Sequence, residues 1–165
     1  MPDFQFQYVL LGALAIALLV AAFTDIRRRQ IDNWLNGAIA LAAPLYWWTS
    51  GMALDAIGWQ LASTFITFAV LLALFMARQM GGGDVKLLTA LALWIQPLWF
   101  LRLLVVMAIV GGALTLVLAL VHRLRSQGGR VKIPYGVAIA SAGLWVLAVQ
   151  YLPLFRPSVL GGGAG

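Results

Sequence analysis

Six apolar stretches make up most of the chain, and several of them approach the length of a bilayer crossing. They cover about residues 8–24, 34–48, 56–77, 85–96, 98–121 and 133–155. A helix needs ~20 apolar residues to cross the hydrocarbon core, so stretches 34–48 and 85–96 are short. All six should be helical, because a strand with open edges cannot satisfy its backbone hydrogen bonds in lipid. The sequence therefore predicts an all-α, polytopic membrane protein with about six transmembrane helices.

Composition supports a membrane environment and excludes several kinds of site. Only 10% of the 165 residues are charged, whereas 63% are hydrophobic, and Cys is absent. Without Cys there are no disulfides, thiolate metal sites or Cys nucleophiles, and the single His122 cannot build a His-based metal site. We therefore expect neither a metal nor a cofactor. We interpret the net charge of +6 as a signal of membrane orientation rather than of nucleic-acid binding.

The basic residues concentrate in three alternate loops. Loops 25–33, 78–86 and 122–132 carry nine of the 11 Lys and Arg residues: Arg27, Arg28, Arg29, Arg78, Lys86, Arg123, Arg125, Arg130 and Lys132. By the positive-inside rule these loops face the cytoplasm and both termini lie outside. No Lys or Arg precedes the first stretch, so it is interpreted as an anchor, not a secretory signal. We expect a single transmembrane domain over residues 1–155 and a flexible tail over 156–165.

Aromatic side chains end the stretch 34–48 on the predicted outer side. These are Tyr46, Trp47 and Trp48. Such residues are enriched at membrane–water interfaces. We interpret the three as an aromatic belt.

The stretch ARQMGGGDVKLL, residues 77–88, places a carboxylate at the border of an apolar run. The predicted topology puts Asp84 and Asp25 at the same membrane boundary, although 59 positions separate them. Two close carboxylates tend to share one proton, which suits hydrolysis by an activated water. Three glycines precede Asp84 and can take unusual dihedral angles and lie close to another chain. We expect an extended substrate strand to lie against Gly81, Gly82 and Gly83.

Simpler interpretations of these residues remain open. Asp84 suits the N-cap of the following helix, and Asp25 can pair with the arginines after it. Lys86 is a candidate for binding a substrate carboxylate or for biasing Asp84, but it is equally an interfacial anchor. Asp32 and Asn33 are alternative caps for the helix that follows them.

Three motifs together resemble those of the prepilin peptidases, the GxGD membrane aspartic peptidases of the type IV leader peptidase family. GGGDVKLL resembles the GxGD signature, and DIRRRQIDNWLN resembles the motif that holds the first catalytic Asp. KIPYGVAIASAG, residues 132–143, resembles the segment that opens the last helix. The resemblance covers roughly residues 8–150 and keeps the order and spacing of the family.

The resemblance implies that Asp25 and Asp84 are the catalytic pair of an aspartic endopeptidase in the bacterial inner membrane. It implies a prepilin or pseudopilin substrate with a short basic leader, a Gly before the cut and an apolar helix after it. Cleavage would take place at the cytoplasmic face. Oligomeric state is not implied.

The chain departs from the family pattern at two places. Asp32 stands where the family usually has Pro, which adds a third carboxylate near the predicted site. Larger, bifunctional members carry a Cys-x-x-Cys insert after the first helix and also N-methylate the pilin. Here that loop has about nine residues and no Cys, so the chain resembles the short members that serve Flp (tight-adherence) pili. We predict a peptidase without methyltransferase activity.

Rival functions use the same two aspartates differently. An archaeal preflagellin peptidase would differ only in its substrate. A non-enzymatic membrane subunit or small transporter would use Asp25 and Asp84 as a proton or ion relay. Transporters tend to have inverted repeats and acidic residues near the midplane, and neither feature is found here.

Overall fold

The computed structural model describes residues 4–124 and 135–151, which form helices and no strand. The predicted all-α fold is therefore confirmed. The ends of the sixth predicted stretch, most of the third basic loop, Lys132, Pro134 and the tail 156–165 lie outside the described residues. The helices are α1 (Phe4–Arg28), α2 (Asn33–Thr49), α3 (Leu54–Met76), α4 (Gly82–Ala92), α5 (Pro97–Leu124) and α6 (Tyr135–Tyr151).

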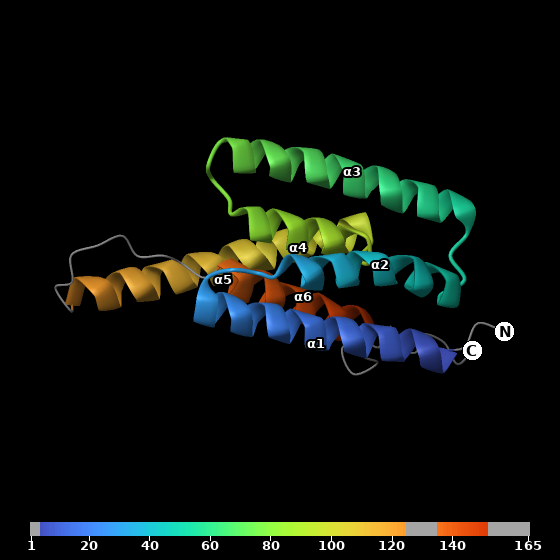
Figure 1. Cartoon of the computed structure of the whole chain (residues 1–165), viewed down its shortest axis with the longest axis horizontal. Helices are drawn as coiled ribbons and strands as arrows, with labels where there is room; N and C mark the ends of the chain where they lie inside the picture. Colours follow the sequence, from blue (N-terminus) through green and yellow to red (C-terminus); the bar gives the residue numbers. More distant parts are fainter. Residues whose placement is uncertain (1–3, 125–134, 152–165) are drawn as a thin grey trace, which may run out of the picture.

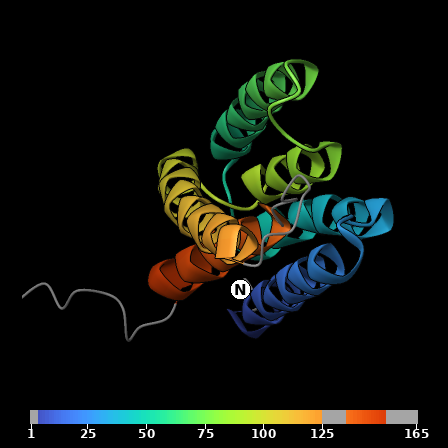
Figure 2. The same ribbon diagram turned by 90° about the vertical axis from the view of Figure 1, so that its left-hand side faces the viewer.

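The helices pack side by side around α4 and α6 (Figures 1 and 2). α1 packs against α2 and α6, α5 packs against α6, and α4 packs against both α2 and α6. α3 packs mainly against α4 and lies at the edge of the bundle. This arrangement brings the end of α1 and the starts of α2, α4 and α6 to one end of the molecule.

The helices divide into long and short ones. α1, α3 and α5 are long and apolar enough to cross a membrane, and large apolar side chains on their outer faces are exposed. α6 is apolar but has only 17 residues, and α2 has 17 residues with Pro44 inside it. α4 has 11 residues, or ~17 Å, and cannot cross the ~30 Å hydrocarbon core. The chain is thus a polytopic membrane protein that combines spanning helices with shorter packed ones.

Polar side chains fix the carboxyl end of α4 inside the bundle. Gln60 on α3 is 4% exposed and donates to the carbonyls of Ala92 (2.6 Å) and Ile95 (2.8 Å). Trp47 Nε1 on α2 donates to the Leu93 carbonyl (2.8 Å). The last carbonyls of a helix have no partner within it, so these donors satisfy groups that burial would otherwise leave unpaired. The start of α4, about three turns away, is held in place as a result.

Removing these donors should destabilise the fold. Gln60→Leu keeps the volume but removes the donor to the Ile95 carbonyl, whereas the Ala92 carbonyl keeps a hydrogen bond from Thr64 (2.9 Å). We expect a loss of about 1–3 kcal/mol. Thermal unfolding in detergent measures it. Gln96→Leu, at an exposed position, is the matched control and should be nearly neutral. Equal effects of the two substitutions would contradict this role of Gln60.

The predicted aromatic belt is wrong for two of its three residues. Tyr46 and Trp47 are 6% and 8% exposed, whereas Trp48 is 80% exposed. The Tyr46 ring stacks on Trp94 with a centroid distance of 5.1 Å, and its hydroxyl lies 2.7 Å from that of Tyr151. Tyr46 and Trp47 therefore belong to the protein core, where hydrogen bonds between helices occupy their polar atoms.

Candidate active site

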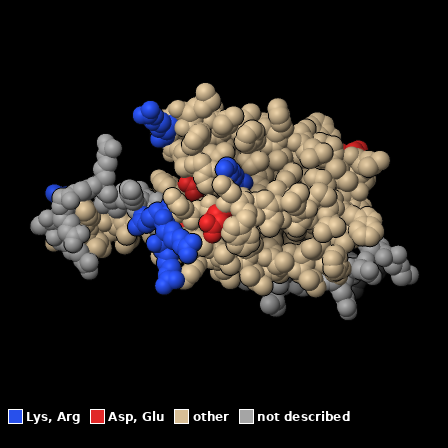
Figure 3. Space-filling view, viewed as in Figure 1, with Lys and Arg blue, Asp and Glu red and all other residues tan. Residues whose placement is uncertain are grey.

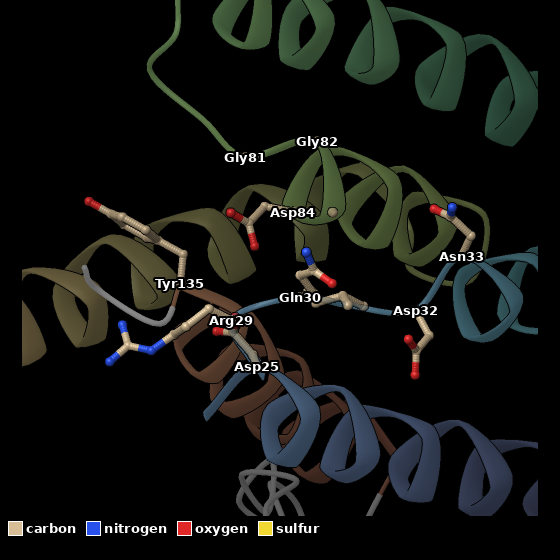
Figure 4. Close-up of a pocket in the computed structure, with 11 residues that line it drawn as sticks. Asp25, Arg29, Gln30, Asp32, Asn33, Gly81, Gly82, Asp84 and Tyr135 are labelled. Carbon is tan, nitrogen blue, oxygen red and sulfur yellow. The ribbon is translucent and has the colours of Figure 1, made fainter. Parts of the chain in front are cut away.

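A cleft of about 730 Å³ opens at the end of the bundle where α1 ends and α2, α4 and α6 begin (Figure 4). It contains both predicted catalytic aspartates and all three glycines that precede Asp84. Arg29, Gln30 and Asn33 also line it, although sequence reasoning did not assign them to the site. The lining residues are Asp25, Arg29, Gln30, Ile31, Asp32, Asn33, Gly81, Gly82, Gly83, Asp84 and Tyr135.

Asp25 lies in the last turn of α1 and is only 7% exposed. Its Oδ2 accepts a hydrogen bond of 2.8 Å from the Gly136 N–H, and the Val137 N–H is a second donor to this carboxylate. Both donors belong to the first turn of α6, where N–H groups have no partner within the helix. Asp25 therefore caps α6 from another helix, 111 positions away in the sequence.

Gly136 explains why Asp25 can approach the α6 backbone so closely. A Cβ at this position would lie 2.8–2.9 Å from Oδ2, Cβ and Cγ of Asp25, well inside contact distance. Gly136 therefore permits close packing, and the group packed against it is the predicted catalytic carboxyl. Tyr135 lies on the rim of the same cleft.

The chain leaves α1 through a left-handed turn that leads into the cleft wall. Arg29 has φ 55°, and its N–H bonds to the Asp25 carbonyl at 2.9 Å. Residues 30–32 then run along the cleft to the start of α2. Ile31, 8% exposed, anchors this link in the core, because it packs against Gly83 of α4.

Asp84 lies in the first turn of α4, but it is not the N-cap. Gly81 occupies the cap position, and its N–H donates to the Asp84 carboxylate. The N-cap interpretation of Asp84 is therefore wrong, although its carboxylate still satisfies a backbone donor at the helix start. Burial, and then the negative charge of Asp25, raise the pKa of Asp84 to about 6, while the Gly81 hydrogen bond acts in the opposite direction.

The three glycines serve close packing rather than unusual dihedral angles. Gly81 has φ −74° and ψ 145°, which any residue can adopt, and among the described glycines a positive φ is found at Gly51 instead. The expectation of unusual dihedrals is thus wrong. A Cβ on Gly82 would lie 3.3 Å from the Phe75 ring, and one on Gly83 would lie 3.4 Å from Ile31. One on Gly81 would lie 2.9 Å from the Asp84 Oδ2, beside the carboxylate in the cleft.

The structure also places Lys86 and Asp32, the two other charged residues that the sequence associated with the site. Lys86 does not line the cleft; its Nζ donates to the Asn33 Oδ1 at 2.7 Å and links α4 to the start of α2. Asp32 is the N-cap of α2 by backbone position, but its side chain makes no cap hydrogen bond. It is half-buried and lines the cleft, so three carboxylates share this space.

The charges around the cleft are mixed. Arg27, Arg28 and Arg29 are exposed at the end of α1, and Arg27 also stacks over the Phe23 ring at 5.3 Å. The space-filling view shows this basic group beside acidic atoms on the same face (Figure 3). Over residues 4–124 and 135–151, no set of three or more His, Cys, Asp or Glu side chains is arranged to hold a metal.

Comparison with protein families identifies the chain. Residues 12–120 match the model of the type IV leader peptidase family, well over half of the sequence. The chain belongs to the type IV leader peptidase family. The membership makes it a peptidase that works in a membrane environment on prepilin-type substrates. The matched region contains Asp25, the three glycines and Asp84, and it ends before Gly136. Neither the curated proteins nor the solved structures gave a match.

Proposed function

We propose that this leader peptidase is an aspartic enzyme in which Asp25 and Asp84 together activate the water that hydrolyses the leader peptide. The observation that carries the proposal is that both carboxylates line one solvent-accessible cleft, with the pKa of Asp84 raised to about 6. One ionised carboxylate takes a proton from water while the protonated one hydrogen-bonds the scissile carbonyl. The reaction then needs no covalent enzyme intermediate. The peptidase domain of this proposal is residues 1–155.

The proposed substrate is an Flp-like prepilin with a basic leader, cut after a Gly. The carboxylates of the cleft favour a cationic leader, and the cleft lies at the end of the bundle that carries the arginines of loop 25–33. By the positive-inside rule this end faces the cytoplasm, which would be that of a bacterial inner membrane. The apolar helix of the pilin would then pack in lipid beside the enzyme.

The proposed enzyme lacks N-methyltransferase activity. The link between α1 and α2 spans only residues 29–32, and the chain has no Cys. The resemblance is therefore to short members without the Cys-containing insert. Mature pilin released by this enzyme should carry an unmodified amino terminus.

Co-expression with an Flp-type prepilin tests the proposed function. Mass spectrometry of the pilin should show loss of the leader after Gly and a new, unmethylated amino terminus. A prepilin with that Gly replaced by Leu is the matched control and should remain uncut. An uncut wild-type prepilin, with both proteins present in the membrane, would contradict the proposal. Methylated product would contradict the part that concerns methyltransfer.

The pH profile of cleavage should report the shared proton. Asp84 loses its proton as the pH rises through about 6, and the pair then holds no proton for the scissile carbonyl. We expect the rate to fall about ten-fold for each pH unit above this value. Initial rates in detergent between pH 4 and pH 9 measure this fall in the cleavage rate. Thermal unfolding at each pH is the control for stability. A rate that still increases from pH 7 to pH 9 would rule out this ionisation.

Asp32 should select for a basic leader. Asp32→Asn is expected to raise KM about two- to five-fold for a prepilin with a basic leader, because a half-exposed ion pair contributes little. For a prepilin whose leader has Lys and Arg replaced by Gln, wild type and Asp32→Asn should have the same KM. Asp55→Asn, on α3 and away from the cleft lining, is the control. An equal rise in KM with both leaders would contradict a role of Asp32 in recognising the basic leader.

A further inference from the structure

The two carboxylates of the cleft have different partners. Asp25 accepts hydrogen bonds from two backbone N–H groups, those of Gly136 (2.8 Å) and Val137, whereas Asp84 accepts one, from Gly81. The donors to Asp25 are the first N–H groups of a 17-residue helix, and the donor to Asp84 is the cap residue of an 11-residue helix. The pair is therefore not symmetric.

This difference affects where the shared proton resides. The start of a helix carries a partial positive charge, and hydrogen bonds from N–H groups are stronger to a carboxylate than to a neutral carboxyl. A proton on Asp25 would weaken both bonds to α6. Asp84 is half-buried and lies in the field of the Asp25 charge, and a proton there relieves the repulsion between the two carboxylates.

Among the other charged groups around the cleft, Arg29 favours the same distribution. Arg29 follows Asp25 by one helical turn and acts on it as a nearby positive charge. Asp32, on the link between α1 and α2, and Tyr135 also line the cleft. Lys86, which is near Asp84 in the sequence, is outside the cleft lining and bonded to Asn33, so it does not offset the Asp25 charge within the cleft.

We propose that α6 assigns the two catalytic roles, so that Asp25 is the base that accepts the water proton and Asp84 carries the shared proton. Gly136 is the positioning residue, because it lets Asp25 reach the first N–H groups of α6. This inference rests on the proposed two-Asp mechanism and adds the identity of each partner.

The roles give a balanced reaction. Asp25 takes a proton from water as the water oxygen bonds to the scissile carbonyl carbon, and the Asp84 proton moves to the carbonyl oxygen. A tetrahedral diol forms. The proton on Asp25 then passes to the leaving nitrogen as the C–N bond breaks, and one diol hydroxyl returns its proton to Asp84. The products are a carboxylic acid and an amine, and the pair regains its starting state.

Carboxyl titration by NMR tests the assignment without any substrate. All five acidic residues are Asp, so protein labelled with ¹³C at the Asp carboxyl should give five side-chain signals. Single Asp→Asn variants assign them. As the pH falls, the Asp84 signal should take up its proton before the Asp25 signal does. In Asp25→Asn, the midpoint for Asp84 should move to lower pH, because a negative neighbour is gone. Protonation of Asp25 first, or of both together, would overturn the assignment.

A glycine substitution tests the role of α6 itself. In Gly136→Ala, the midpoint of Asp25 should rise by at least about half a pH unit, because its donors are displaced. Gly112→Ala should leave it unchanged, since a Cβ there meets nothing within 4 Å. An unchanged Asp25 midpoint in folded Gly136→Ala would overturn the positioning role. If Gly136→Ala does not fold, the order of titration in the wild type still decides the assignment.

Failure of this inference is distinguishable from failure of the proposed function. If Asp25→Asn and Asp84→Asn both lose cleavage but Asp25 takes up the proton first, only the assignment of roles is wrong. If either variant still cleaves prepilin at the wild-type rate, the two-Asp mechanism is wrong whatever the titration shows.

Discussion

Asp25→Asn and Asp84→Asn are each expected to lower prepilin cleavage by about 10³-fold or more, with both proteins still folded and present in the membrane. Asn keeps the shape of Asp but can neither accept nor release the proton, and each step of the proposed mechanism uses both carboxyls. Single-turnover cleavage of a purified prepilin, read on a gel, measures the loss. Near wild-type cleavage by either variant would show that its carboxyl is not catalytic.

Thermal stability provides the control for these variants, and the contribution of Asp84 to stability should depend on pH. The pKa of Asp84 is raised in the folded state to about 6 from an ordinary value of 3.8, so folding favours its protonated form. Its contribution to stability is greatest below pH 3.8 and is lost as the pH rises through 6. Asp84→Asn, which is always neutral, should therefore unfold at a higher temperature than wild type at pH 8. Less stable Asp84→Asn protein at pH 8 would contradict the burial of this charge.

Gly136→Ala should lower kcat about 10²-fold and change KM much less. The added methyl group would lie 2.8–2.9 Å from three atoms of Asp25, so either the carboxyl or the start of α6 must shift. Small displacements of a catalytic group have effects of this size, because the reacting atoms lose their alignment. The same gel assay, run over a range of prepilin concentrations, separates kcat from KM.

Two other glycines provide matched controls for Gly136→Ala. Gly112→Ala, on the exposed face of α5, adds a Cβ that meets nothing and should leave kcat unchanged. Gly111→Ala places its Cβ at 3.6 Å from Ala138 and from the Tyr135 ring, an ordinary packing distance, and should have a small effect. If Gly136→Ala retained full activity, the contact between Asp25 and α6 would not matter for catalysis.

Several properties of the protein follow from the sequence alone. The length of the apolar stretches predicted helices, because lipid leaves a spanning backbone no other way to pair its polar groups. The basic loops predicted that the end of the first stretch and the start of the fourth lie at one end of the molecule. The structure brings Asp25 and Asp84 into one cleft there, and the three motifs predicted the family that the comparison shows.

Other properties depended on the tertiary structure. Gly136 contacts Asp25, and Gln60 donates a hydrogen bond to a carbonyl at the end of α4. Tyr46 and Trp47 lie in the core instead of in an aromatic belt. The physical reason lies in the solvent. Lipid is about as apolar as a protein interior, so an outward-facing Leu and a buried one look alike in the sequence, and the inner face of each helix cannot be deduced. Hydrogen bonds and the space around single glycines determine that face, and only the packed helices show them.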